Sequence, residues 1–159
     1  MSRIYRLAAA ACSALLVVLA LAPAALAGSV SLGSHNLRTS AWSGSTSQGG
    51  HIVFSDSGGK IKGEIDWAAR CADGAKLQGA TDFHSTLHHG VFKASGKYKG
   101  PVKGHGKTYE GHFTAAIIGH VGAASSHGGF ALKTTIYSKS GSRVTSCKTG
   151  GVSWKAHKG

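Results

Sequence analysis

The sequence has 159 residues, and its 18 lysines and arginines outnumber six aspartates and glutamates, giving a formal net charge of +12. Glycine occurs 24 times, which excludes long helices, and the 42% content of hydrophobic residues excludes a disordered chain. The composition therefore favours one basic globular domain built from strands.

The first 27 residues have the pattern of a secretory signal peptide. Arg3 and Arg6 precede an apolar run at 7–21, and Ala25-Leu-Ala27 is a small-x-small cleavage pattern ahead of Gly28. The apolar run is short for a membrane anchor, and no later stretch is apolar enough to span a bilayer. We therefore expect a signal-peptide helix at 1–27, a Ser/Gly-rich segment at 28–50 and a β-domain at 51–159, in a secreted, extracellular protein.

Alternation of apolar and polar residues predicts strands along most of the remaining chain. Strands are expected at 35–42, 51–54, 59–71, 76–83, 90–94, 97–103, 107–118, 130–137, 143–148 and 152–157, with 90–94 and 97–103 as two short strands or one kinked strand. The stretches 43–50 and 120–129 are expected to be loops, 84–89 a loop or strand end, and 149–151 a turn. Pro101 lacks an amide donor, which predicts that its strand lies at an edge or contains a bulge.

The clearest strand is 59–71, in which Ile61, Ile65 and Trp67 share one face and charged residues occupy most of the other. Glycines on inward faces indicate places where a side chain would collide with a neighbour, namely Gly63, Gly79 and Gly111. Seven to nine strands separated by Gly/Ser turns predict an all-β fold. The two architectures that fit are a single antiparallel β-sandwich and a flattened β-barrel.

Two cysteines remain after the signal peptide, Cys71 and Cys147. Neither has a second cysteine two to four residues away, as structural zinc sites have, and an isolated pair in an exported protein is typical of a disulfide. A closed loop of about 77 residues is worth roughly 4.5 kcal/mol if the bond acts through chain entropy. We expect this disulfide to bring Trp67 together with Trp154 in one core.

The stretches around these cysteines resemble a known group of proteins. Gly59-Lys-Ile-Lys-Gly63, Trp67-x-Ala-x-Cys71 and the closing run from Cys147 to Ala156 are similar to the core of small exported bacterial β-proteins of unknown function. In that group a Cys-x-x-Gly-x-Val-x-Trp-x-Ala pattern recurs near the C-terminus. The resemblance covers roughly 57–157; it implies an all-β fold and transfers no catalytic residue.

Histidine is in excess, with ten residues that all lie after the signal peptide. His84, His88 and His89, with Asp82 nearby, form the densest group and are candidate ligands for Zn or Cu. On a straight strand, residues 84 and 88 would lie about 13 Å apart, too far for one ion without a bend. Solvated loop histidines are the competing interpretation.

Lysine dominates the positive charge, with 13 of the 16 basic residues in 28–159. Lysine favours diffuse attraction to anionic surfaces over base-specific recognition. The predicted hairpins place seven lysines on what we expect to be a basic face, Lys60, Lys62, Lys93, Lys97, Lys99, Lys103 and Lys107. Expected partners are anionic polymers, that is wall polymer, acidic polysaccharide or nucleic acid. A solvated face that only keeps the protein soluble is the competing interpretation.

Enzyme chemistry has less support. Glu64 and Asp66 would lie roughly 6–7 Å apart on a strand, a separation that glycosidases use, but pairing with Lys60, Lys62 and neighbouring strands is the preferred explanation. His112, Lys107 and Glu110 are a ribonuclease-like set by residue type, without a supporting motif. The sequence therefore predicts a secreted binding or structural module for anionic extracellular or cell-surface polymers. The alternatives are a histidine-dependent metal protein or small secreted hydrolase, and a small-ligand carrier within a β-barrel.

Overall fold

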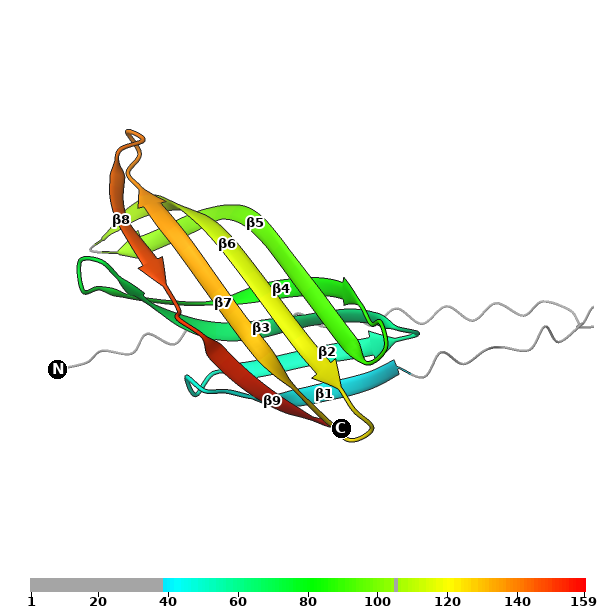
Figure 1. Ribbon diagram of the computed structural model, residues 1–159. Helices are drawn as coiled ribbons and strands as arrows, with labels where there is room; N and C mark the ends of the chain where they lie inside the picture. Colours follow the sequence, from blue (N-terminus) through cyan, green and yellow to red (C-terminus); the bar gives the residue numbers. More distant parts are fainter. Residues whose placement is uncertain (1–38, 105) are drawn as a thin grey trace, which may run out of the picture. The chain divides into compact units, whose positions relative to one another are not determined.

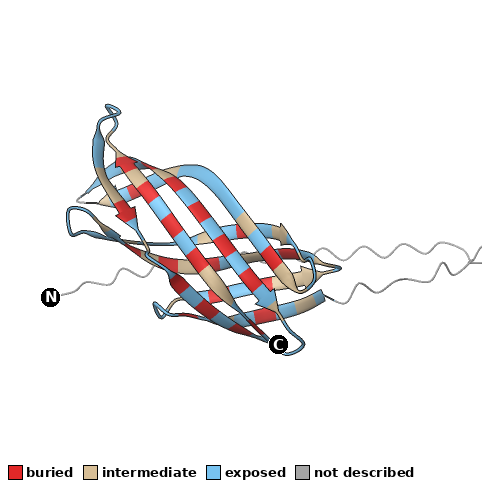
Figure 2. Ribbon diagram, in the orientation of Figure 1, coloured by how far each residue is buried: buried red, intermediate tan, exposed pale blue. Residues whose placement is uncertain are grey.

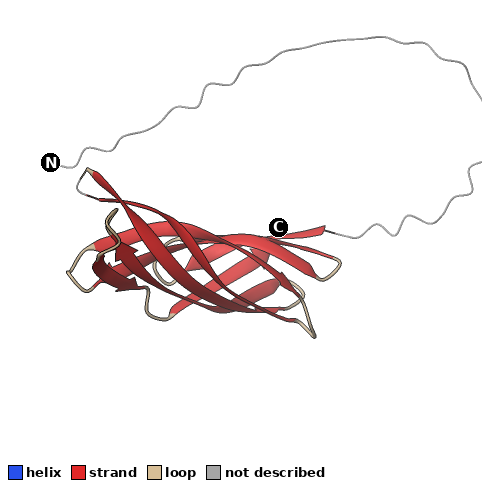
Figure 3. Ribbon diagram, turned by 90° about the horizontal axis from the view of Figure 1, so that it is seen from above, coloured by secondary structure: helices blue, strands red, loops and turns tan. Residues whose placement is uncertain are grey.

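Nine antiparallel strands form one sheet in the computed structural model, which describes residues 39–104 and 106–159 (Figure 1). The strands are β1 Thr39–Thr46, β2 His51–Ser57, β3 Lys60–Cys71, β4 Lys76–Thr86, β5 Val91–Gly104, β6 Lys107–Val121, β7 Ser125–Tyr137, β8 Arg143–Lys148 and β9 Val152–Lys158. Short loops join them, as Figure 3 shows, and the predicted all-β class is confirmed.

Two meanders make up the sheet, and the C-terminal strand joins them. The strand order is β4-β3-β2-β1-β9-β7-β6-β5, so β9 lies between the first strand and the seventh. β8 pairs with both β7 and the end of β3, which ties the second meander to the first at another place. The edge strands are therefore β4 and β5, and the edge position predicted for the strand of Pro101 is confirmed.

The predicted signal peptide and the predicted start of the first strand at 35–38 lie outside the described residues. The sheet itself already begins at Thr39, within the segment that the sequence separates as 28–50. None of the described residues belongs to a helix that could cross a membrane.

The buried residues alternate along the strands, as Figure 2 shows, and they meet in two aromatic clusters. In the larger one, the Phe54 ring contacts Trp42, Phe92 and Trp154 with ring centroids 5.6 to 6.0 Å apart. In the smaller one, Phe113 packs against Trp67 at 6.1 Å and Tyr98 at 4.7 Å. The expected inward face of 59–71 is confirmed, because Ile61, Ile65 and Trp67 are buried. Trp67 and Trp154 belong to one hydrophobic core, as expected, but they lie in different aromatic clusters within it.

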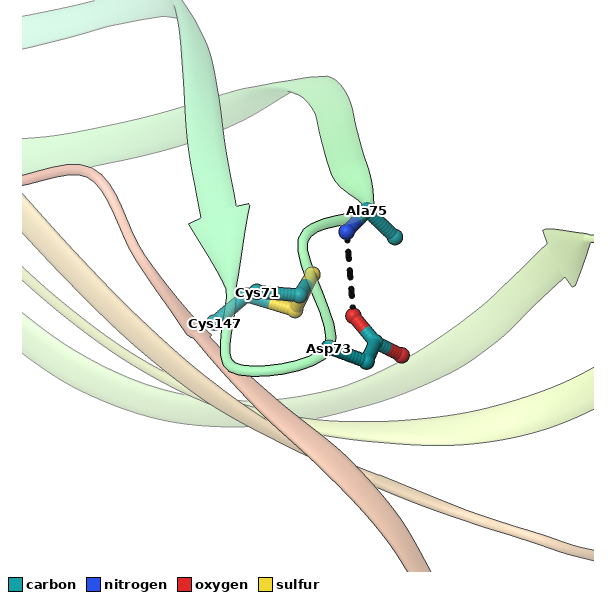
Figure 4. Close-up of a disulfide and its surroundings, with 4 residues drawn as sticks. All are labelled: Cys71, Asp73, Ala75 and Cys147. Carbon is teal, nitrogen blue, oxygen red and sulfur yellow. Dashed lines mark hydrogen bonds between the residues drawn. A yellow bond between two sulfur atoms is a disulfide. The ribbon is translucent and has the colours of Figure 1, made fainter.

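The disulfide itself joins Cys71 on β3 to Cys147 on β8, across a sequence separation of 76 (Figure 4). The two cysteines are cross-strand partners, and next to them Asp73 closes the β3–β4 turn by accepting a hydrogen bond from the Ala75 amide at 3.1 Å. The predicted pairing is confirmed.

Two segments predicted to be loops are largely strand. β1 continues to Thr46, and 120–129 contains only a tight turn between β6 and β7; for 84–89, the strand-end alternative holds as far as Thr86. The glycines responsible for these errors serve close packing: a Cβ on Gly44 would lie 1.9 Å from the Lys155 carbonyl oxygen, and one on Gly128 would lie 2.0 Å from that of Ile118. The predicted turn at 149–151 also does not reverse the chain, because β8 and β9 both run antiparallel to β7 and follow one another along it.

One buried hydroxyl on β7 lacks a partner. Thr134 is 3% exposed and its Oγ1 makes no hydrogen bond. A buried polar group without a partner costs about 1–3 kcal/mol, so Thr134→Val, which replaces the hydroxyl by a methyl of similar size, should raise the free energy of unfolding by about 1 kcal/mol. Urea denaturation measures this directly. A loss of stability in Thr134→Val would contradict the assignment of an unsatisfied hydroxyl.

Candidate anion-binding surface

Five basic side chains stand in one line across the sheet. Lys97 on β5 faces Thr114 on β6, which faces Lys133 on β7, and Lys133 faces Lys148 on β8. Lys148 faces Arg70 on β3, and Arg70 faces Lys76 on β4. Directly opposed residues of antiparallel strands project from the same side of a sheet. We call Lys97, Lys133, Lys148, Arg70 and Lys76 the basic row.

The basic row is open to solvent and carries no compensating charge. Its five members and Thr114 are all exposed. Both ion pairs found among the described residues use Glu110, so no carboxylate there lies within 4.0 Å of a nitrogen of the basic row. Five strand spacings of roughly 4.8 Å give the row a length of about 24 Å. The result is a band of positive charge that crosses the strands at a right angle and is broken only by Thr114 on β6.

Two carboxylates lie well away from this band. Glu64 faces Asp82 directly, on β3 and β4, and six residues separate Glu64 from Arg70. Six residues of strand correspond to about 20 Å. The Glu64 and Asp82 carboxylates are therefore too far along β3 and β4 to neutralise the basic row.

Seven lysines were predicted to form one basic face, and four of them share the exposed side of β5. Lys93, Lys97, Lys99 and Lys103 alternate along the exposed side of β5, as the sequence predicts. Lys60 and Lys62 lie on β3, with β4 between them and β5, and Lys107 starts β6 opposite Gly104. Whether these seven bind anions stays a prediction. Sequence reasoning missed four of the five members of the basic row: Arg70, Lys76, Lys133 and Lys148.

Glu110 is the carboxylate nearest to the basic row on β6. It contacts the His112 Nε2 and lies 3.5 Å from Lys99 Nζ. The hydrogen bond from His112 and, secondly, the charge of Lys99 lower the pKa of the Glu110 carboxyl. Two members of the proposed ribonuclease-like set, His112 and Glu110, are thus in contact, with Lys99 beside them. Hydrolysis by this set stays a prediction.

The three histidines proposed as metal ligands are exposed, with His84 on β4 and His88 and His89 at the turn into β5. Within the described residues, no three His, Cys, Asp or Glu side chains gather closely enough to hold an ion. Zn or Cu binding stays a prediction. The structure instead pairs His120 with His127 across β6 and β7, with their rings stacked at 5.4 Å.

Glu64 and Asp66, the proposed glycosidase-like pair, have different surroundings. Glu64 faces Asp82, whereas the Asp66 carboxylate accepts a hydrogen bond from the His51 amide at 3.1 Å. The Asp66 contact ties β3 to the start of β2, which is a structural role. Neither contact assigns a general acid or base.

Comparison of the chain with protein-family models, with curated proteins and with solved structures found no match. The functional interpretation therefore depends on the geometry of the surface itself.

Proposed function

We propose that this protein binds linear anionic polymers of the carbohydrate type, that is acidic or phosphate-bearing wall polysaccharide, along the basic row. The observation that carries the proposal is the line of five exposed cations on five strands, with no carboxylate of the described residues within 4.0 Å of their nitrogens. A polymer lying across the strands would meet one positive charge at nearly every strand it crosses. Each contact is weak by itself, but a polyanion engages the contacts together and releases its counterions.

The surroundings of the row favour carbohydrate over nucleic acid. Single-stranded nucleic acids are held by base stacking on aromatic side chains in addition to charge. Tyr98, which follows Lys97 in the sequence, is 38% exposed, but one face of its ring is covered by Phe113 at 4.7 Å and its hydroxyl is hydrogen-bonded to Thr81. Beside the row on β6 and β7 stand the small residues Thr114, Ala116 and Ala131. Such a surface supplies charge and a smooth path without stacking platforms.

We also propose that the domain works outside the cytoplasm, as a flattened and incompletely closed barrel. The disulfide suits an oxidising compartment, and 1–27 has the composition of a signal peptide. The barrel is supported by β8, which pairs with both β3 and β7, and by contacts across the gap between the edge strands β4 and β5. A flexible polymer can bend along the curved outer surface of such a barrel.

The test compares the binding of a variant that lacks three charges of the basic row with the binding of a variant that lacks three charges outside it. The variant Lys97→Gln/Lys133→Gln/Lys148→Gln should bind dextran sulfate and polyphosphate about a hundredfold more weakly, since each lysine near an anionic surface contributes about 1 kcal/mol. For the wild-type protein, log K against log salt should fall with a slope of about −3.5 if five charges act. Isothermal titration at several salt concentrations measures both quantities.

The matched control, Lys60→Gln/Lys62→Gln/Lys107→Gln, removes the same net charge from lysines outside the row and should weaken binding only several-fold. Equal losses in the two triple variants would mean that net charge alone attracts the polymer, and the row would then have no special role. Oligothymidylate provides the nucleic-acid comparison: tighter binding to it than to dextran sulfate at the same salt would overturn the carbohydrate assignment.

A further inference from the structure

A cavity of about 200 Å³ lies where the edge strands β4 and β5 face each other, and residues of β3, β6 and β7 complete its lining. No backbone ladder joins these two strands outside their connecting turn in the described residues. Two side-chain hydrogen bonds span the gap, from Ser85 Oγ to the Lys93 carbonyl at 2.7 Å and between Thr81 Oγ1 and Tyr98 OH at 2.8 Å. The cavity is lined by buried residues and also by exposed ones, and Gly96 and Tyr98 in its lining adjoin Lys97 of the basic row.

Small residues on β5 and β6 create this space. Ala94 and Gly96 on β5 face Ile117 and Ala115 on β6, and all four line the cavity. A Cβ built on Gly96 would meet no atom within 4 Å, whereas one on Gly63, Gly79 or Gly111 would collide with an aromatic ring. The glycine at position 96 is therefore not required by packing, and its missing side chain leaves room for something else.

The walls of the cavity are apolar and its end is polar. Phe83, Phe130 and Ile65 contribute buried side chains. At the polar end, the Trp67 indole N–H donates to Thr81 Oγ1 at 2.8 Å, and Thr81 Oγ1 shares one further hydrogen bond with Tyr98 OH. The two hydroxyls carry two protons, and only one lies between them. Whichever hydroxyl donates, the other keeps a proton that can be given to an acceptor in the cavity.

We infer that this cavity binds a small, neutral, planar aromatic molecule that carries one hydrogen-bond acceptor. An apolar cavity of about 150 Å³ is large enough for benzene, so the volume here suits a substituted single ring. The space between two adjacent strands favours a flat molecule. The carboxylates of Asp82, which lines the cavity, and of Glu64, its cross-strand partner, disfavour anions. The free hydroxyl proton selects a carbonyl or ether oxygen over a purely apolar ring.

The test compares acetophenone with ethylbenzene, which has a similar size but no acceptor. Titration of the whole protein, followed by NMR shifts of the Trp67 indole and the Gly96 amide, should show saturable one-to-one binding of acetophenone. One hydrogen bond corresponds to about tenfold in affinity, so ethylbenzene should bind about tenfold more weakly. Absence of saturation with acetophenone, or equal affinity for the two molecules, would overturn the inference.

Variants locate the site. Gly96→Val places methyl groups in the open space and should weaken acetophenone binding at least tenfold without lowering thermal stability, because valine suits a strand and meets no neighbour. Gly104→Val is the control on the same strand, with equally open surroundings but outside the cavity, and should bind like the wild type. If Gly96→Val binds acetophenone as well as the control does, the molecule occupies another place and the inference fails.

Discussion

Alanine in place of both Cys71 and Cys147 is expected to lower the free energy of unfolding by about 4.5 kcal/mol. The bond closes a loop between residues 76 apart. A long closed loop restricts the unfolded chain strongly, and its loss returns that entropy to the unfolded state. Single domains have a net stability of about 5–15 kcal/mol, so the variant would lose a large part of it. Urea denaturation of the wild type and the double variant measures the difference.

A reductant separates the effect of the bond from that of the substitutions. Dithiothreitol in the denaturation series should destabilise the wild type by a similar amount and leave the double alanine variant unchanged. Should the variant fail to fold, mass spectrometry of the unreduced wild type still decides the matter. Two free thiols there would refute the disulfide, and a wild-type midpoint that is insensitive to reductant would refute its energetic role.

Gly128→Ala is expected to lower the free energy of unfolding by about 3 kcal/mol, near the upper end of overpacking effects. Gly128 and Gly119 are cross-strand partners on β7 and β6, and the Trp154 ring lies against both. An added Cβ at 128 would lie 2.0 Å from the Ile118 carbonyl oxygen and 2.5 Å from Trp154 Cζ2. The backbone of β6 cannot withdraw without breaking its ladder, so the strain must be retained or the strands must separate.

The neighbouring glycine is the matched control for this substitution. A Cβ on Gly129 would lie 3.8 Å from the nearest atom, which is ordinary contact. Gly129→Ala should therefore leave stability within about 0.5 kcal/mol of the wild type or raise it slightly, because alanine reduces the freedom of the unfolded chain. Comparable losses in Gly128→Ala and Gly129→Ala would show that the contact with β6 and Trp154 does not account for the effect.

Strand character and inward faces could be predicted from the sequence, because alternation in 59–71 or 130–137 reflects burial on one side only. Strand limits could not be predicted where glycine is frequent. Glycine in a sequence signals either a turn or a close approach of backbones, and only the packed structure separates these cases. Gly119 and Gly128 lie under Trp154, a residue that is distant in sequence, so nothing local identifies them as strand residues.

The basic row could not be predicted from the sequence, because it depends on the register in which β6, β7 and β8 pair. A turn at 122–124 places Thr114 opposite Lys133, but a ten-residue loop at 120–129 leaves that register undefined. A register shift between Ile136 and Tyr137 then places Lys133 opposite Lys148. Without this irregularity the pairing would move by one residue and place Lys148 on the other face. Only the Arg70–Lys148 contact could have been anticipated, because both residues adjoin the predicted disulfide.

The position of β9 between β1 and β7 determines when the sheet can form. A chain delivered from its N-terminal end can build the meander β1–β4 and then β5–β7, because each strand pairs with its predecessor. The two meanders are joined by the last two strands, first by Arg143–Lys148, which pairs with β7 and β3, and then by Val152–Lys158, which pairs with β1 and β7. Cys147 arrives only shortly before, so oxidation of the thiols and union of the two half-sheets fall at the same late moment. The single sheet can therefore be completed only after almost the whole chain is available for pairing.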